Sequence, residues 1–451
     1  MEIERRVETS FENDCCFLRV LIFCANFAQR MSIKVHIDCN NFYASCEVSS
    51  RPDLYGKPVV VANCNEAGGG IILALTKEAK TLGLKRGNPV FRVKELLAKN
   101  NVAVFPANIP KYVDISKKIM QVVIASGIVQ DFIQYSVDEF FGTIPVDDAD
   151  ELRIYIGKVK DAIMQSTGIP VSCGASLTNT LAKVATWFAK HYPAYHEICV
   201  LPKDKIDMAL RKLPIEDVWG IGRASTPRLH YDNINTAYEF AFKSESYIKQ
   251  RFSIAGVRTW KELHGVSCID VSSPPKQRSI MLSRTFAYMT DSEETLHTYI
   301  SNYAAGTARK LRDQHSVCCT ITTFIVTNRH RDDLSQYGNS ATRRLTTPTA
   351  DTVEIVKGAL DMLHQIFRSG YQYKKAGVIL GDISDDRAIQ LDLFTSQNEN
   401  PKRTRKLMET TDSINTRFGM NKIRLASQGY EEKNYKMKEV QQNKSESTED
   451  T

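Results

Sequence analysis

The segment IKVHIDCNNFYASCE, residues 33–47, decides how the chain begins to fold. Apolar and polar residues alternate from Ile33 to Asp38, and this alternation predicts a β-strand with Asp38 at its end. The residues that follow, from Cys39 to Glu47, predict a turn into a helix. The strand therefore presents one carboxylate at its end, directly before a helix begins.

A second acidic site lies far along the chain, where Asp138 and Glu139 interrupt the strand-like stretch 135–141. Two acidic sites on strands are what two-metal phosphoryl transfer needs, because magnesium prefers oxygen ligands and is usually held by a few carboxylates. Asp38, Asp138 and Glu139 could supply those carboxylates. Adjacent acids near a strand end are more often solvated turn residues, so this pattern alone does not decide between the two interpretations.

Composition sets broad limits on the class of protein. A chain of 451 residues is too long for one core, so we expect several domains. The net charge of +7 is compatible with nucleic-acid binding but not diagnostic of it. No apolar run approaches the roughly 20 residues that span a bilayer. The 11 cysteines show no zinc-site spacing and are interpreted as reduced thiols.

The first thirty residues form a poor signal peptide, because acids stand where a basic start is needed. Either Met31 is the natural start, or residues 1–30 are a disordered extension.

Three stretches resemble the palm motifs of Y-family DNA polymerases, and they occur in the family's order. They are residues 38–47, residues 135–139, and residues 172–176 together with 181–185. Further stretches resemble the UmuC-like branch in particular; these are residues 51–61, 217–223 and 375–378. The resemblance as a whole extends from Met31 to Lys438.

The resemblance implies a mixed α/β (α+β) fold, a right-hand polymerase with palm, fingers, helical thumb and a separate little finger of β-α-β-β-α-β order. The domains expected from it are a palm at 31–50 and 107–200, fingers at 51–106, a thumb with a helix-hairpin-helix at 201–272, a little finger at 276–388, a clamp-binding peptide at 389–395, and a UmuC-like C-terminal segment with a disordered tail at 396–451.

The resemblance also implies roles in catalysis. Asp38 and Asp138 would each ligate metal, Glu139 would hold the catalytic ion, and the backbone carbonyl of Cys39 would add a ligand. The cofactor implied is a pair of Mg²⁺ ions, with Mn²⁺ as a substitute. Asn41, Phe42 and Tyr43 would meet the triphosphate, with Tyr43 as the steric gate against a ribose 2′-hydroxyl.

Lysines complete the implied nucleotide site. Lys190 matches the triphosphate lysine, whereas Lys183 on the same helix is equally well explained as a solvated lysine. The fingers depart from the pattern, because Lys77 and Lys80 stand where many relatives have Tyr-x-x-Arg. Lys80 keeps the positive charge but loses the bidentate fork of arginine. The glycine-rich loop at 63–70 is also unlike that of UmuC relatives.

DNA contacts are expected in two places. Gly220 and Gly222 lie in the stretch that resembles a thumb hairpin, where glycine lets backbone N–H groups approach a phosphate. In the little finger, basic residues would grip phosphates, although each is as well explained as a plain surface charge; they include Arg284, Arg343, Arg344 and Lys375, beside Arg329, Arg331 and Lys374.

A five-residue peptide after the little finger, Gln390, Leu391, Asp392, Leu393 and Phe394, resembles the sliding-clamp docking peptide of bacterial polymerases; a core strand is the alternative. The residues from Thr395 on are poor in apolar side chains and are expected to be disordered. A UmuD-like accessory partner is implied less directly, because the tail that normally ends such chains differs here.

The function implied is template-directed, error-prone DNA synthesis across damage in the bacterial cytoplasm, with primer-template DNA, dNTPs and the sliding clamp as partners and no membrane. A catalytically weak DNA- and clamp-binding regulatory protein is the alternative. A nucleotide-cyclase-type palm enzyme is a third reading, but it would need neither the thumb hairpin nor the clamp peptide.

Overall fold

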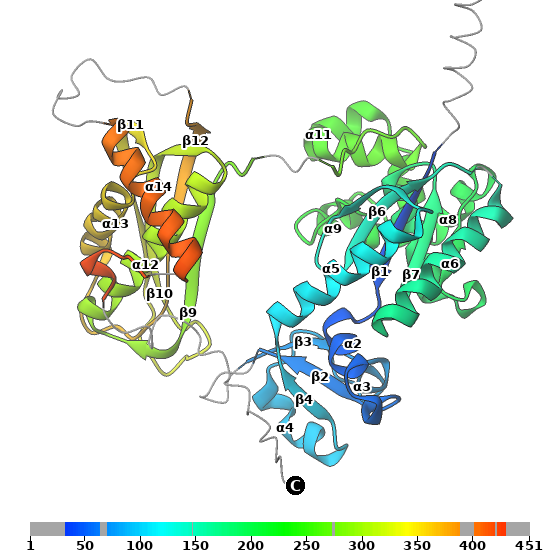
Figure 1. The fold of residues 1–451 in the computed structure, drawn as a ribbon, viewed down its shortest axis with the longest axis horizontal. Coiled ribbons are helices and arrows are strands. Elements are labelled where there is room, and N and C mark those ends of the chain that lie inside the picture. Colours follow the sequence, from blue (N-terminus) through cyan, green and yellow to red (C-terminus); the bar gives the residue numbers. More distant parts are fainter. Residues whose placement is uncertain are drawn as a thin grey trace, which may run out of the picture. The chain divides into compact units, whose positions relative to one another are not determined.

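The computed structural model describes residues 32–63, 70–146, 148–272, 276–387, 401–419 and 422–429. These residues form two compact units, and the boundary between the units lies in the short stretch between residues 272 and 276 (Figure 1). None of the described helices combines the length and the hydropathy needed to cross a bilayer. The extension at 1–30, most of the glycine-rich loop and the predicted clamp peptide lie outside the described residues.

The first unit is built on a five-stranded sheet with β1 (Ile33–Cys39) in the middle. β6 (Glu139–Ile144) and β7 (Val171–Ser176) flank β1, and both run antiparallel to it. β5 (Gln130–Gln134) and β8 (Ile198–Val200) form the edges. The predicted first strand is therefore the central strand of this sheet.

The alternation along β1 sends its side chains to two different environments. Val35 and Ile37 pack in a core with residues of α5 (Ile109–Ser126) and α6 (Ala149–Thr167). His36, which points to the opposite face, instead contacts α7 (Asn179–His191). Because Asp38 is two residues further on, it lies on the same face as His36, and α7 therefore covers the functional face of the sheet.

A small three-stranded sheet of order β3-β2-β4 follows α2 (Phe42–Ser49). Its strands are β2 (Val59–Ala62), β3 (Ile72–Leu75) and β4 (Ala103–Pro106), accompanied by α3 (Lys77–Thr81) and α4 (Val90–Lys99). The sequence predicts that the glycine-rich loop leads into a helix with Lys77 and Lys80, and α3 carries both lysines. The structure differs in that β3 precedes this helix and pairs with β2.

The remainder of the first unit is helical. Leu229, Phe240 and Ile248 pack there into one core with Leu181 and Phe188 of α7. The elements are α8 (Ile206–Lys212), α9 (Thr226–Tyr231), α10 (Ala237–Ala241) and α11 (Glu245–Leu263), and short 3-10 turns lie at Pro52–Leu54, Pro193–Tyr195, Lys203–Lys205 and Ile215–Asp217.

The second unit has the β-α-β-β-α-β order predicted for the little finger. Its antiparallel sheet has the strand order β11-β10-β12-β9, and α12 and α13 lie beside it (Figure 1). Side chains of both helices pack with the sheet in one core. The elements are β9 (Ile280–Thr290), α12 (Glu293–Asp313), β10 (Ser316–Thr327), β11 (Gly338–Thr349), α13 (Thr352–Ile366) and β12 (Tyr373–Asp385).

Part of the segment expected to be disordered has a defined structure. α14 (Pro401–Phe418) is joined to α12 because the Arg312 guanidinium donates to both carboxylate oxygens of Asp412, at 2.7 and 2.9 Å. A short 3-10 turn (Ala426–Gln428) follows, and Gln428 exchanges two hydrogen bonds with Asn302 of α12. The low hydrophobicity of this segment led to an incorrect expectation, because the segment is attached to α12 through hydrogen bonds between polar groups and not through apolar packing.

Candidate active site

Strand register brings the three predicted carboxylates together. Asp38 on β1 is directly opposite Glu139 on β6. Asp138 adjoins them through its backbone, since its carbonyl accepts a 2.9 Å hydrogen bond from the N–H of Cys39, and its charge helps to raise the pKa of Asp38. Among the described residues, however, the potential ligand atoms that lie within 4.8 Å of one another come from His36, Asp38 and Glu139 and not from Asp138. Ser136 fixes the turn before β6, since its hydroxyl donates to Asp138 Oδ1 at 2.6 Å and accepts from the N–H of Glu139 at 3.1 Å. Residues about one hundred positions apart therefore form a single cluster.

Two lysines of α7 lie on this cluster. Lys190 Nζ is 2.5 Å from Asp38 Oδ1, and Lys183 Nζ lies 3.0 and 3.2 Å from the two oxygens of Glu139. The two lysines are two helical turns apart and share one face of α7. Burial raises the pKa of Asp38, and the positive charge of Lys190 opposes that rise. Both ammonium groups therefore occupy positions where carboxylates attract cations.

His36 also belongs to this site, although the sequence analysis did not single it out. Its Nδ1 is 2.9 Å from Thr186 Oγ1, and Nε2 has no hydrogen-bond partner among the described residues and lies 3.7 Å from Glu139 Oε1. Burial, together with the charges of two nearby lysines, holds the pKa of His36 well below 6.5, so the ring is neutral. The signal was present in the sequence, because residues two apart on a strand share a face.

The donor set of this site fits a divalent cation. One potential ligand atom from each of His36, Asp38 and Glu139 lies within 4.8 Å of the others. The Cys39 thiol does not fit as a ligand, because burial raises its pKa well above 9 and a thiolate is the ligating form. Its side chain is buried, which leaves the backbone carbonyl as the group that this residue could offer.

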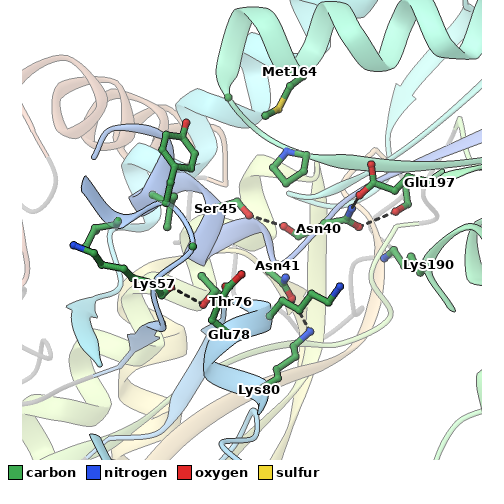
Figure 2. A pocket seen from close by; sticks show the side chains of 18 of the residues that line it. Asn40, Asn41, Ser45, Lys57, Thr76, Glu78, Lys80, Met164, Lys190 and Glu197 are labelled. Carbon is green, nitrogen blue, oxygen red and sulfur yellow. Dashed lines mark hydrogen bonds between the residues drawn. The ribbon is translucent and has the colours of Figure 1, made fainter. Parts of the chain in front are cut away.

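A cavity of about 630 Å³ is lined by Lys190 and by residues of the loop between β1 and α2 (Figure 2). Lys190 both lines it and contacts Asp38, so this lysine connects the cavity with the carboxylates. Four lysines line the cavity against two acids; these are Lys57, Lys77, Lys80 and Lys190, and Glu78 and Glu197. The cavity is therefore suited to an anion.

The loop between β1 and α2 borders this cavity. Asn40 fixes the loop, since its side chain accepts from Ser172 Oγ at 2.9 Å and donates to Glu197 at 3.3 Å (Figure 2). Asn41 adopts a left-handed conformation with φ of 51°, and no side chain caps the first turn of α2. The backbone N–H groups of Phe42 and Tyr43 therefore remain available to an anion.

Lys80 reaches this loop from the small three-stranded sheet. Its Nζ donates to Asn41 Oδ1 at 2.7 Å. Desolvation lowers the pKa of Lys80, and the nearby charge of Lys190 lowers it further. A negatively charged group between these two lysines would relieve their repulsion.

The predicted steric gate has a support that the sequence analysis missed. The ring of Tyr43 is stacked on Tyr112, with centroids 4.4 Å apart and an interplanar angle of 20°. The hydroxyl of Tyr112 donates to Glu47 at 2.7 Å, and Glu47 in turn accepts from Lys111 at 2.7 Å. Phe42, in contrast, is a buried core residue, which leaves its backbone for a ligand.

The predicted hairpin lies between the 3-10 turn Ile215–Asp217 and α9. Gly220 has φ of 93°, and a Cβ there would lie 2.6 Å from Thr259 Oγ1, so glycine is required for two reasons. Gly222 is different, because nothing lies within 4 Å of the position that a Cβ would take.

Register separates four of the seven basic residues predicted to contact DNA on the second unit. Lys375 is opposite Thr285 and Val326, and Arg344 is opposite Thr320, on the sheet face that the helices leave open. Arg343 is opposite the buried Ile321 on the helix-covered face and pairs with Asp361 of α13. Arg284 is opposite the buried Ala376, on that same covered face.

Comparisons with known proteins agree with these features. The sequence profile of the impB/mucB/samB family matches residues 37–187, that of the family's C-terminal domain matches 277–393, and a domain of unknown function, DUF4113, matches 405–448. Protein UmuC of Salmonella typhimurium is 35% identical over 397 residues, which cover 87% of this chain and 92% of UmuC. Protein MucB of Escherichia coli is 33% identical over 87% of this chain and 92% of MucB.

More distant relatives are similar over the same length. DNA polymerase IV 2 of Halalkalibacterium halodurans is 27% identical, over 86% of this chain and 93% of that protein. A solved Y-family DNA polymerase chimera of Dbh and Dpo4 superposes with a TM-score of 0.61 at 20% identity, over 78% of this chain and 99% of the chimera. This likeness confirms the predicted right-hand fold. The chain therefore belongs to the impB/mucB/samB family of UmuC-like proteins, which has the fold of Y-family DNA polymerases.

Proposed function

We propose that this chain is a template-directed DNA polymerase that adds dNMP to a primer 3′-end and tolerates damage in the template. Family membership and fold support the activity. One observation carries the chemistry: Asp38, Asp138 and Glu139 form one cluster beside a lysine-lined cavity. An acidic cluster that adjoins an anion site is the arrangement that nucleotidyl transfer requires.

The triphosphate would lie in the cavity. Backbone N–H groups of Phe42 and Tyr43, at the N-terminus of α2, would donate to it, and Asn41 holds Lys80 at the cavity. Lys190 would neutralise phosphate charge once it leaves Asp38. The ring of Tyr43, stacked on Tyr112, would fill the space that a ribose 2′-hydroxyl needs.

Asp38, Asp138, Glu139 and the carbonyl of Cys39 would hold two Mg²⁺ ions, for which Mn²⁺ would substitute. Such a pair activates the primer 3′-hydroxyl and stabilises the leaving pyrophosphate. The protein's own contribution is to hold the carboxylates in place through strand register and Ser136, and to supply cations that balance their charge before metal binds.

DNA and other partners would bind outside this cluster. Primer-template DNA would contact the hairpin at Gly220 and Gly222 and the basic residues of the second unit, of which Arg344 and Lys375 lie on the open sheet face and Arg284 and Arg343 on the covered face. The peptide Gln390, Leu391, Leu393 and Phe394 would bind the sliding clamp, and a UmuD-like protein would be an accessory partner. The protein would act in the bacterial cytoplasm, on the DNA of the nucleoid during repair.

Primer extension tests the proposal. Wild type should extend a primer with Mg²⁺ and dNTPs on an undamaged template and past an abasic site. The double variant Asp138→Ala/Glu139→Ala should lose at least a thousandfold in rate, because the ligands for the catalytic ion are gone. Asp114→Ala removes an exposed acid of α5 and serves as the matched control, with unchanged extension.

Two results would contradict the proposal. Extension that survives the double substitution would remove catalysis from these carboxylates. No extension by wild type, even with clamp and a UmuD-like partner, would favour the alternative of a catalytically weak DNA- and clamp-binding protein.

A further inference from the structure

The ammonium group of Lys183 is surrounded by aromatic rings. Its Nζ lies 5.1 Å from the ring centroid of Tyr135, 5.7 Å from that of Phe141 and 5.0 Å from that of Trp219. The rings also support one another, because Trp219 packs at 5.6 Å against both Tyr135 and Phe141. Aromatic rings around an ammonium group attract it through their quadrupoles without neutralising its charge. We call Tyr135, Phe141 and Trp219 the lysine cage.

The lysine cage surrounds the ammonium group of Lys183 where this group contacts the carboxylate of Glu139. An ammonium group has three N–H donors, and two oxygens of Glu139 lie within hydrogen-bonding distance of Nζ. The lysine side chain is only 17% exposed, so it has little freedom to leave. Lys190 on the same helix also pairs with a carboxylate, but no ring contact is recorded for it in the described part of the chain. The cage is therefore specific to the lysine on Glu139.

The members of the cage come from different parts of the first unit. Phe141 is on β6 and Tyr135 is in the turn before it, whereas Trp219 is in the hairpin directly before Gly220. The hairpin is also held by α11, since the hydroxyl of Thr259 donates to the carbonyl of Trp219 at 3.3 Å. One residue of the hairpin thus contacts a lysine that contacts a catalytic carboxylate.

We propose that Trp219 and Lys183 are positioning residues for Glu139: the lysine cage holds the ammonium so that it keeps Glu139 in its ligating orientation, and Trp219 thereby makes that orientation depend on the hairpin. This inference rests on the proposed polymerase function and deepens it. With a metal ion bound at Glu139, the cage would retain the Lys183 ammonium beside the site, so that this group would not be a free competitor for the carboxylate.

A double-mutant cycle tests the proposal on the full chain. The variants are Trp219→Leu, Lys183→Met and their combination, with Trp219→Phe as the conservative variant that keeps an aromatic face. Single-turnover incorporation is measured at saturating DNA and dNTP as a function of Mg²⁺ concentration, and DNA affinity is measured separately. We expect Trp219→Leu to lower the maximal rate about tenfold, a factor between those of an exposed and a fully desolvated cation–π contact, and Trp219→Phe to stay within about threefold of wild type.

The decisive comparison is non-additivity. In the Lys183→Met background, Trp219→Leu should have no further effect on rate, because its influence passes through the lysine. Equal losses from Trp219→Leu in both backgrounds, or a Trp219→Phe variant as slow as Trp219→Leu, would show that Trp219 only supports the hairpin and would overturn the proposal.

A second readout does not need catalysis. Binding of Mn²⁺ to the protein without DNA, followed by electron paramagnetic resonance, should weaken in Trp219→Leu and Lys183→Met to the same extent, and no further in the combination. Additive or absent effects on Mn²⁺ affinity would contradict the inference even if wild type proves inactive. If wild type does not extend a primer but the variants show the expected changes in Mn²⁺ affinity, only the polymerase function is contradicted.

Discussion

At the scale of single residues, the proposed role of Tyr43 as a steric gate would depend on how firmly its ring is held. Tyr43 is stacked on Tyr112, whose hydroxyl is bound by Glu47. Tyr112→Phe removes that hydrogen bond but keeps the stack, so we expect the preference for dNTP over rNTP to fall about threefold to tenfold. Tyr43→Ala removes the ring itself and should reduce the preference about 10- to 200-fold. The ratio of kcat/KM for dNTP and rNTP measures both, and an unchanged ratio in Tyr112→Phe would show that the stack needs no anchor.

His36 gives a pH dependence of stability whose direction is fixed by its environment. Its pKa in the folded protein is well below the ordinary 6.5, because burial and the charges of Lys183 and Lys190 oppose protonation. Below about pH 6.5 the unfolded chain therefore takes up a proton that the folded protein does not. The contribution of His36 to the free energy of unfolding is therefore complete above that pH. It is lost as the pH falls, by at most about 1.4 kcal/mol per pH unit.

His36→Leu should remove this dependence, because leucine does not titrate and Thr186 keeps its hydrogen bond to the carbonyl of Ala182. Urea unfolding at pH 7.5 and pH 5.5 compares the variant with wild type. His191→Leu, at an exposed position on α7, should keep the wild-type dependence. A fall in stability that is equal in His36→Leu and wild type would assign the dependence to other groups.

At the scale of elements, α7 is the helix that supplies both active-site lysines, and a buried carboxylate holds its start. Glu262 of α11 is fully buried, and its Oε2 accepts from the N–H of Thr180 in the first turn of α7 at 2.8 Å. Its Oε1 accepts from the N–H groups of Cys268 and Ile269 at 2.9 and 3.0 Å. A negative charge at a helix N-terminus is favourable. Four donor groups bind to Glu262: three N–H groups donate to its side chain, and one hydroxyl donates to its backbone carbonyl.

Glu262→Gln should therefore destabilise the first unit by about 2–4 kcal/mol, because an amide cannot accept at both positions and leaves buried N–H groups without a partner. Glu245→Gln changes an exposed glutamate of the same helix that pairs with Lys261, and it should cost less than about 1 kcal/mol. The free energy of unfolding in urea measures both. A cost for Glu262→Gln no greater than that of its control would mean that α7 is held by packing alone.

The elements also show which features a sequence can predict. β1 was predictable because its alternation is local, and the carboxylates were predictable because their motifs resemble those of a known family. β3 was not, since a short apolar run after a glycine-rich loop fits either a strand or the start of a helix. The pairing of Asp38 with Glu139, the support of Tyr43 by Tyr112, and the contact of Glu262 with α7 all depend on register or packing between residues 69 to 101 positions apart, which no local pattern encodes.

At the scale of the whole molecule, a net charge of +7 is modest for a protein that holds a polyanion, so the placement of charge matters more than its sum. Arg344 and Lys375 lie on the open face of the second unit's sheet, and Lys375 also lies 5.7 Å from the ring of Phe324. Arg343 is next to Arg344 in the chain but is paired with Asp361 on the other face. Arg343 and Arg344 are adjacent in the sequence, but they are expected to contribute differently to DNA binding.

If the open face binds the DNA backbone, Arg344→Gln/Lys375→Gln should reduce the salt dependence of DNA affinity by a slope of about 2 in a plot of log K against log[salt], since each released phosphate contact contributes about 0.9. Arg343→Gln should leave the slope unchanged, because its charge is already balanced by Asp361. Fluorescence anisotropy with a primer-template duplex between 50 and 300 mM salt, about the range over which such slopes are measured, gives both values. Equal slopes for the double variant and wild type would place the DNA contacts of this unit elsewhere. A reduced slope in Arg343→Gln would mean that its pair with Asp361 opens when DNA binds, so that register alone does not determine which charges meet the phosphates.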